Sequence, residues 1–255
     1  MTGKFLVFCR LFSAVTCLMA ATSTFAQEFD PTEADFNRMR SLMIEELRRY
    51  AVLASVETGI KEFDDAVLEV MGVVPRHEFV PKRIRRYAYL NTPLPLGHDQ
   101  NISQPYIIAL MTHLARVEKS DVIFETGTGA GYHGAILSRL GSRVFSVEVV
   151  KPLVAGAKAR LKDLGYDNIE IKHGVGYYGW REKGPYDVMI IKEAIHHIPP
   201  PLLNQLKRGG RMVAPVGPLD GAQMLKLIEK DAEGKITERA ILPVQFSPLQ
   251  GGERI

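Results

Sequence analysis

The chain has 255 residues, of which 46% are hydrophobic and 24% charged, with 22 glycines and 15 prolines. This balance is typical of a globular domain, and it excludes a disordered tail, a collagen-like repeat and a protein with many membrane spans. The formal net charge is +3, and no long block of lysines and arginines of the nucleic-acid-binding type is present. We therefore expect one globular unit that does not bind nucleic acid.

The first 26 residues have the pattern of an export signal. Lys4 and Arg10 are the only charges in this segment, a mostly apolar stretch runs over 11–22, and Thr24-Phe25-Ala26 has a small residue at each end. This order is that of a secretory signal peptide and its cleavage site. The apolar stretch is shorter than the roughly 20 residues that a membrane span needs. We expect 1–26 to be a signal peptide, and the cleaved protein to be periplasmic without stable membrane association.

Both cysteines of the chain, Cys9 and Cys17, lie in this leader, and the remaining 229 residues have none. A cysteine-free chain suits an oxidising compartment. Cleavage would also lower the net charge to +1. Two alternatives stay open: a retained N-terminal anchor, and a mis-assigned start that would leave the protein in the cytoplasm.

The first part of the remaining chain, 27–117, is predicted to be mainly helical. Apolar residues at helical spacing after Asp30-Pro31 predict a helix over 32–56. A second helix is predicted at about 62–72 and a third from Ser103-Gln104-Pro105 to about residue 116. The segment 76–97 between them is rich in prolines and basic residues, and we expect it to be irregular.

The second part, 118–255, alternates strands and helices. Strands are predicted at 121–126, 144–147, 168–172, 186–191 and 211–215, with helices at 131–140, 151–164 and 200–206. Such alternation indicates a parallel sheet covered on both faces. The last two strands, 224–229 and 236–246, form an antiparallel hairpin across 231–234. The fold class is therefore α/β: a doubly wound, mostly parallel sheet of seven strands, in a single domain with an N-terminal helical extension.

A glycine-rich loop follows the first of these strands, with the sequence Glu125-Thr126-Gly127-Thr128-Gly129-Ala130-Gly131. Glycines there allow a tight turn and a close approach to a ligand. Glu148 ends the next strand, where an acid can accept hydrogen bonds from ribose hydroxyls. The pattern alone also suits a nicotinamide cofactor or a turn without a ligand. Glu125 favours a ligand with ammonium and sulfonium charges, because it would repel a pyrophosphate.

Six segments together resemble the protein-L-isoaspartate O-methyltransferases, which use S-adenosylmethionine to esterify the abnormal carboxylate of isoaspartyl residues. The segments are Val74-Pro75-Arg76-His77-Glu78-Phe79-Val80-Pro81, Pro93-Leu94-Pro95-Leu96-Gly97-His98, Ile102-Ser103-Gln104-Pro105-Tyr106, Gly127-Thr128-Gly129-Ala130-Gly131-Tyr132, Leu206-Lys207-Arg208-Gly209-Gly210-Arg211 and Leu242-Pro243-Val244-Gln245-Phe246-Ser247-Pro248-Leu249. The glycine loop is common to many methyltransferases, whereas the second and third segments are specific to this family. The resemblance covers nearly the whole chain after the leader and implies the Rossmann-like methyltransferase fold.

The resemblance implies a protein-repair enzyme that methylates L-isoaspartyl and D-aspartyl residues, and Ser103 as its active-site residue. Ser103 could also be the N-cap of the helix that follows it. We expect a monomer whose partners are isoaspartyl-containing proteins or peptides. The residues expected to bind S-adenosylmethionine are Ile102, Ser103, Glu125, Gly127, Gly129, Gly131, Glu148 and Gly176. Glu148 could instead only pair with Lys151.

Three single positions depart from the family pattern. Val175 stands where an acid usually serves the adenine amino group, and a lost hydrogen bond of this kind costs on the order of 1 kcal/mol. Asn101 stands where threonine is usual before Ile102-Ser103, and Gln250 where threonine is usual near the C-terminus. We therefore expect weakened donor binding.

The largest departure is Lys192-Glu193-Ala194-Ile195-His196-His197, where the family favours small residues. Three interpretations stay open: a metal site of Glu193, His196 and His197, recognition of an acidic acceptor by Lys192, and side chains that turn outward to solvent. An alternative function also stays open, namely an exported binding or accessory module that has lost donor binding. Val175 and the leader favour this alternative, since the periplasm has no evident supply of the donor. The retained glycines, Glu148 and Ser103 favour the enzyme.

Overall fold

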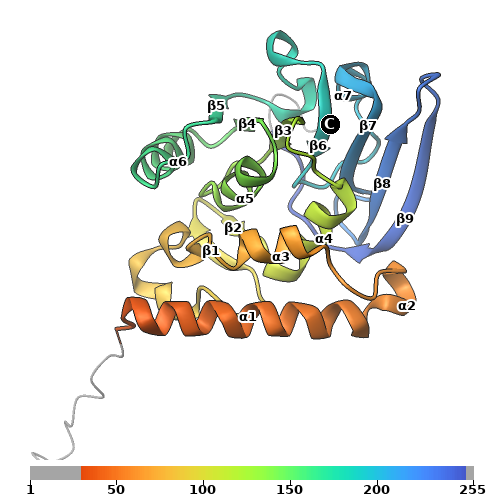
Figure 1. Cartoon of the computed structure of the whole chain (residues 1–255). Coiled ribbons are helices and arrows are strands. Elements are labelled where there is room, and N and C mark those ends of the chain that lie inside the picture. The colour runs from red at the N-terminus through yellow and green to blue at the C-terminus, as the bar shows by residue number, and fades with distance from the viewer. Residues whose placement is uncertain (1–29, 251–255) are drawn as a thin grey trace, which may run out of the picture.

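The computed structural model describes residues 30–250, so the predicted signal peptide lies outside the described residues. Within this range, no helix is both long and apolar enough to cross a membrane. The chain forms a helical layer from its N-terminal part and a seven-stranded sheet from its C-terminal part (Figure 1).

The helical layer begins with α1, Glu33–Leu53, which runs along one side of the molecule (Figure 1). Its start is set by a capping box, in which Thr32 and Asp35 exchange hydrogen bonds between side chains and backbone. Met43 and Leu47, one helical turn apart, are buried in the core. The other helices of this layer are α2, Ser55–Thr58, α3, Asp65–Met71, and α4, Pro105–Ala115.

The segment expected to be irregular contains two 3₁₀ helices, η1 at Arg76–Phe79 and η2 at Lys82–Tyr87, and then a small hairpin. Its strands are β1, Leu94–Gly97, and β2, Gln100–Ile102. His98 and Asp99 join them with positive φ values of 54° and 55°. Two such residues form the turn that suits a two-residue hairpin, but a sequence usually announces that turn with Asn-Gly or Asp-Gly. This is why the hairpin was not predicted.

The main sheet has the order β5-β4-β3-β6-β7-β8-β9, parallel from β5 to β7 and antiparallel at β8 and β9. The predicted α/β class with a C-terminal antiparallel hairpin is confirmed. The strands are β3 at Val122–Thr126, β4 at Arg143–Glu148, β5 at Ile169–His173, β6 at Tyr186–Ile190, β7 at Leu206–Val216, β8 at Gln223–Lys230 and β9 at Ile236–Val244. The helices and turns between them are α5 at Tyr132–Leu140, α6 at Lys151–Asp163, η3 at Gly176–Tyr178, η4 at Arg181–Lys183 and α7 at Pro200–Gln205.

Alternation along the strands divides the apolar core in two. Ile123 and Val188 point to one face of the sheet and join the core that contains α1, α4 and α5. Their neighbours Phe124 and Met189 point to the other face, where they pack with Leu202 of α7. Both faces of the central strands β3 and β6 are covered in this way, and consecutive apolar residues are buried along them at 123–124 and 188–190.

Among the predicted strands, the start of β7 differs most from the sequence prediction. It begins at Leu206 rather than at 211, because the pairing with β6 is irregular between Tyr186 and Val188. Gly209, with a φ of 77°, lies in this irregular stretch. The turn residues Arg208-Gly209-Gly210 look like a loop in the sequence, but here they belong to the strand.

Candidate active site

A cavity of about 460 Å³ opens at the carboxyl ends of β3, β4 and β6. The chain continues from β3 through β4 to β5 on one side, and then returns to place β6 on the other side of β3. In open α/β sheets, ligands bind at such a reversal of strand order. The volume lies within the range of about 300–1,000 Å³ that is typical of small-molecule sites.

The glycine loop connects β3 to α5 at the floor of this cavity. Gly127, Gly129 and Gly131 have φ values of 62°, 56° and 95°, which other residues rarely adopt. Gly127 and Gly129 line the cavity. Gly131 does not: it is the N-cap of α5, and a Cβ there would lie 3.0 Å from Leu161 of α6. The first two glycines are therefore placed for ligand contact, and the third for packing.

Glu148, at the end of β4, is buried and lines the cavity. Its Oε2 accepts a hydrogen bond from the backbone N–H of Gly129 (2.8 Å), and its Oε1 accepts one from the N–H of Val150 (2.8 Å). These amides, rather than Lys151, orient the carboxylate. Each carboxylate oxygen has further acceptor capacity, so the arrangement suits a ribose with two hydroxyls.

Glu125, on β3, lies behind the glycine loop and is fully buried. Lys192 Nζ donates to its Oε2 (2.7 Å), and Ser146 Oγ donates to its Oε1 (2.8 Å). The Lys192 side chain is only 8% exposed, so this ion pair is buried on both sides. Glu125 is absent from the cavity lining, and Lys192 covers the carboxylate that the sequence suggested for a cationic ligand.

Glu193 also turns inward. Its carboxylate accepts a hydrogen bond from the Thr126 hydroxyl, and Oε1 lies 2.2 Å from where a Cβ on Gly127 would be. Burial raises the pKa of Glu193 from 4.5 to about 7, with the carboxylates of Glu148 and Glu125 adding to the rise and Thr126 and Lys192 opposing it. The Glu193 carboxylate therefore covers the backbone of Gly127.

These contacts bear on two of the three interpretations of the 192–197 segment, the metal site and the outward-facing side chains; recognition of an acidic acceptor by Lys192 stays a prediction. His196 and His197 are exposed, and the described residues contain no metal-type cluster that includes them or Glu193. The described arrangement therefore does not bring Glu193, His196 and His197 together as the ligands of one ion. The outward hypothesis is wrong for Lys192 and Glu193 and right for the two histidines. The reason is backbone pairing: the Ala194 N–H donates to the Ser247 carbonyl (2.9 Å), which fixes the segment against the C-terminal chain.

Ser103 is partly buried and lines the same cavity as Gly127 and Gly129. The N-cap of α4 is Gln104, followed by Pro105, so the N-cap role suggested for Ser103 is wrong. The Ser103 carbonyl accepts a hydrogen bond from Arg76 Nη2 (2.8 Å). Arg76 is fully buried, and its Nε also donates to the Ala88 carbonyl (2.7 Å). A buried guanidinium thus fixes the backbone at Ser103 and leaves its hydroxyl available.

One cavity therefore brings together five of the eight residues predicted to bind the donor, namely Ile102, Ser103, Gly127, Gly129 and Glu148. The other three, Glu125, Gly131 and Gly176, do not line it. Gly176 packs against Thr126, whose Cγ2 would lie 2.8 Å from a Cβ at that position.

Sequence reasoning missed two parts of the cavity wall. One is the segment 242–248, the end of β9 and the chain just after it, which was assigned only to a strand and to the family resemblance. The other is His133, whose Nε2 lies 2.9 Å from Thr112 Oγ1 and whose buried Nδ1 has no partner. Burial, together with the charge of Lys192, holds the pKa of His133 well below its usual value. An apolar helical pattern gave no signal for this neutral, half-satisfied imidazole.

Residues 40–254 match the family model described as protein-L-isoaspartate(D-aspartate) O-methyltransferase. The chain belongs to this family. It is 50% identical over 209 residues to protein-L-isoaspartate O-methyltransferase 2 of a Polaromonas species, which covers 82% of this chain and 99% of that protein. It is 46% identical over 251 residues to protein-L-isoaspartate O-methyltransferase 2 of Syntrophobacter fumaroxidans, which covers 98% of both chains.

Solved structures agree with this membership in the isoaspartate methyltransferase family. A structure titled protein-L-isoaspartate O-methyltransferase has a TM-score of 0.72 and 28% identity, covering 84% of this chain and 67% of that one. A putative enzyme of the same name from Plasmodium falciparum has a TM-score of 0.69 over 83% of this chain and 98% of that one; at 23% identity it shows a common fold. The predicted family, fold and enzyme class are confirmed, and an accessory module without activity is not favoured.

Proposed function

We propose that this chain transfers the methyl group of S-adenosylmethionine to the carboxylate of L-isoaspartyl and D-aspartyl residues in damaged proteins or peptides. The observation that carries the proposal is the single cavity that joins Ser103 to Gly127, Gly129 and Glu148, in a chain of this family. The names of the relatives give O-methylation of L-isoaspartate, and the description of the family model adds D-aspartate.

The chemistry explains why the reaction needs no strong catalytic base. A carboxyl group has an ordinary pKa of about 4 and is already ionised at neutral pH. The positive sulfur of the donor supplies an activated methyl group. What the chain must add is alignment and the exclusion of water, and alignment alone can contribute about 7–11 kcal/mol. Ser103 suits this task as a hydroxyl that donates a hydrogen bond to the substrate carboxylate.

The cavity fits the donor at Glu148, but Glu193 must move before a donor can approach the backbone of Gly127. Glu148, already oriented by two amides, would accept hydrogen bonds from the ribose hydroxyls. At Gly127, the Glu193 carboxylate covers the backbone that a ligand would approach. We infer that Glu193 turns away from Gly127 when the donor binds, and that its charge then faces the donor's cationic groups.

Donor titration into the full chain, followed by methyl transfer to a synthetic isoaspartyl peptide, tests the proposal. We expect donor binding and peptide methylation, and we expect Ser103→Ala to lower kcat by about tenfold or more, since a hydrogen bond to a charged group is worth about 1.5–3 kcal/mol. Ser138→Ala is the matched control, because the Ser138 hydroxyl bonds only the Ala135 carbonyl inside α5. Absence of donor binding would overturn the proposed function, whereas an unchanged rate in Ser103→Ala would overturn only the role of Ser103.

We also propose that the protein is exported, on the strength of the leader pattern in residues 1–26. The test is N-terminal sequencing of protein recovered from the periplasmic and cytoplasmic fractions of the producing bacterium. Export predicts a periplasmic chain that begins at Gln27. A chain that keeps Met1 and stays in the cytoplasm would contradict it.

A further inference from the structure

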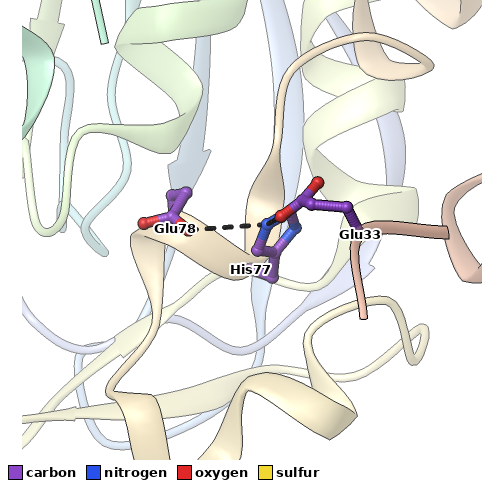
Figure 2. Close-up of side chains that lie close together, drawn as sticks. All are labelled: Glu33, His77 and Glu78. Carbon is purple, nitrogen blue, oxygen red and sulfur yellow. Dashed lines mark hydrogen bonds and ion pairs between the residues drawn. The ribbon is translucent and has the colours of Figure 1, made fainter. Parts of the chain in front are cut away.

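A second cluster of polar side chains lies outside the cavity, where the first turn of α1 meets η1. Figure 2 shows the carboxylates of Glu33 and Glu78 beside the imidazole of His77. Glu33 Oε1 lies 3.3 Å from His77 Nε2, and Glu78 Oε1 lies 3.5 Å from the same nitrogen. Among residues 30–250, this is the one group of three acidic, histidine or cysteine residues whose ligand atoms all lie within 4.8 Å of one another.

Two of the three spacings between these atoms match a tetrahedral metal site, and the third, between the two carboxylates, is within 4.8 Å. Zinc binds histidine nitrogen and carboxylate oxygen at about 2.0–2.2 Å, so the edges of its tetrahedron measure about 3.3–3.6 Å. The two distances to His77 Nε2, 3.3 Å and 3.5 Å, fall on these edges. An octahedral Mg²⁺ site with bonds of about 2.0–2.1 Å has shorter edges, of about 2.9 Å. Mg²⁺ and Ca²⁺ also take oxygen ligands rather than imidazole.

The histidine is oriented as metal-binding histidines are. His77 is 1% exposed and stacks on Phe36, with ring centroids 3.8 Å apart. Its Nδ1 lies 2.8 Å from the hydroxyl of Tyr89, which leaves Nε2 to face the two carboxylates. A hydrogen bond on the far ring nitrogen is the usual second shell of a zinc-bound histidine.

The charges around the cluster also suit a divalent cation. Two carboxylates face one imidazole nitrogen, so a divalent cation that takes the place of the Nε2 proton meets two negatively charged ligands. Arg85 Nη2 pairs with the other oxygen of Glu78, Oε2 (2.7 Å), and so orients this carboxylate without blocking Oε1. Glu33 is 75% exposed, so water can supply the remaining ligand.

We propose that Glu33, His77 and Glu78 form a binding site for one zinc-type divalent cation, completed by water. The ion joins α1 to η1, two elements that otherwise meet here through packing and hydrogen bonds. Glu33 and His77 are 44 positions apart in the chain, so the ion closes a long loop and stabilises the fold.

Titration of Zn²⁺ into the chelator-treated full chain tests this site, with thermal unfolding and Co²⁺ absorption as further readouts. We expect one tight equivalent, a higher Tm with Zn²⁺, and the intense visible absorption of tetrahedral Co²⁺. Glu33→Gln removes an exposed ligand without disturbing the core, and should weaken binding by at least tenfold and abolish the Tm rise. Glu45→Gln, an exposed change on the same helix, should behave as the unaltered chain.

A variant of the orienting group adds a graded test. Tyr89→Phe keeps the ring but removes the hydroxyl beside Nδ1, and loss of such a partner weakens metal binding by about 10–100-fold. Three outcomes would overturn the proposal: no binding by the unaltered chain, equal binding by Glu33→Gln, or a weak octahedral-type Co²⁺ spectrum. Zinc held by Cys9 and Cys17 would give the second of these outcomes.

Discussion

The carboxylates around the glycine loop are held in different ways on its two sides. We call the side with Glu148 the Glu148 end, and the side with Glu125 and Glu193 the Glu125 end. At one end, the Glu148 carboxylate is fixed by the backbone amides of Gly129 and Val150. At the other end, Glu125 and Glu193 are held by side chains, those of Lys192, Ser146 and Thr126. The amides of Gly129 and Val150 cannot move without moving the glycine loop or the start of α6, whereas side chains can exchange partners by changing rotamer. The Glu148 end is therefore preorganised, and the Glu125 end is built to rearrange.

The largest loss of stability should come from breaking the buried Lys192–Glu125 ion pair at the Glu125 end. Lys192→Met leaves the Glu125 carboxylate buried without its partner, and such a loss costs about 3–5 kcal/mol. Urea unfolding measures it. Lys226→Met breaks the more exposed pair with Glu238 and should cost less than about 1 kcal/mol. Adding Glu125→Gln to Lys192→Met should restore most of the stability; without that recovery, the buried charge is not the cause.

A substitution of Glu148 should lower the affinity for the donor without unfolding the protein. In Glu148→Gln, the side-chain NH₂ of the new glutamine faces a backbone N–H that needs an acceptor. The substitution also removes the negative charge that would accept hydrogen bonds from the ribose. Hydrogen bonds to charged groups contribute about 1.5–3 kcal/mol, so donor affinity should fall by about 10–100-fold. Calorimetric titration measures this, with the exposed Glu182→Gln as control. An affinity equal to that of the control would remove Glu148 from the donor site.

Glu193 should make the stability of the fold depend on pH. An unfolded chain loses the Glu193 proton near pH 4.5, whereas the folded chain keeps it up to about pH 7. Its stabilising contribution is therefore full below pH 4.5 and is lost as the pH rises through 7, by on the order of 3 kcal/mol. We expect Glu193→Gln to flatten this part of the stability curve, measured by urea unfolding from pH 4.5 to 8. Parallel curves would show that the pKa of Glu193 is not raised.

The smallest effect concerns Val175, which is partly buried at the start of η3, outside the cavity lining. An acid there would offer the donor's adenine amino group one more acceptor. Val175→Asp should tighten donor binding by about 1 kcal/mol, roughly fivefold, in the same titration. Weaker or unchanged binding would indicate that the Val175 side chain does not reach the adenine position.

The sequence predicted the sheet well and the cavity in part. Strand β3, for example, was placed to within one residue, because a short apolar run at 122–124 directly before a glycine-rich turn favours a buried strand. The β1–β2 hairpin was missed because His98-Asp99 is not a usual turn signal. Ser103, Gly127, Gly129 and Glu148 were found because the ends of strands and the family motifs mark them.

The directions of the Lys192 and Glu193 side chains could not be predicted from the sequence. Both residues look like surface residues in a linear pattern, and they turn inward because 194–195 pairs with 216 and 248, far along the chain. His77 and Glu33 meet for the same kind of reason, since η1 packs against the start of α1. Contacts of this kind depend on which segments the fold brings together.

By itself, the sequence determined the α/β fold, the family and the strand ends that carry the glycine loop and Glu148, because these follow from local periodicity and from motifs of adjacent residues. Only the tertiary structure decided that Lys192 neutralises Glu125, that Glu193 covers Gly127, and that Glu33, His77 and Glu78 converge. The physical reason is that the energy of a charged side chain depends on its neighbours in space and on its burial, and neither is a property of its neighbours in the chain.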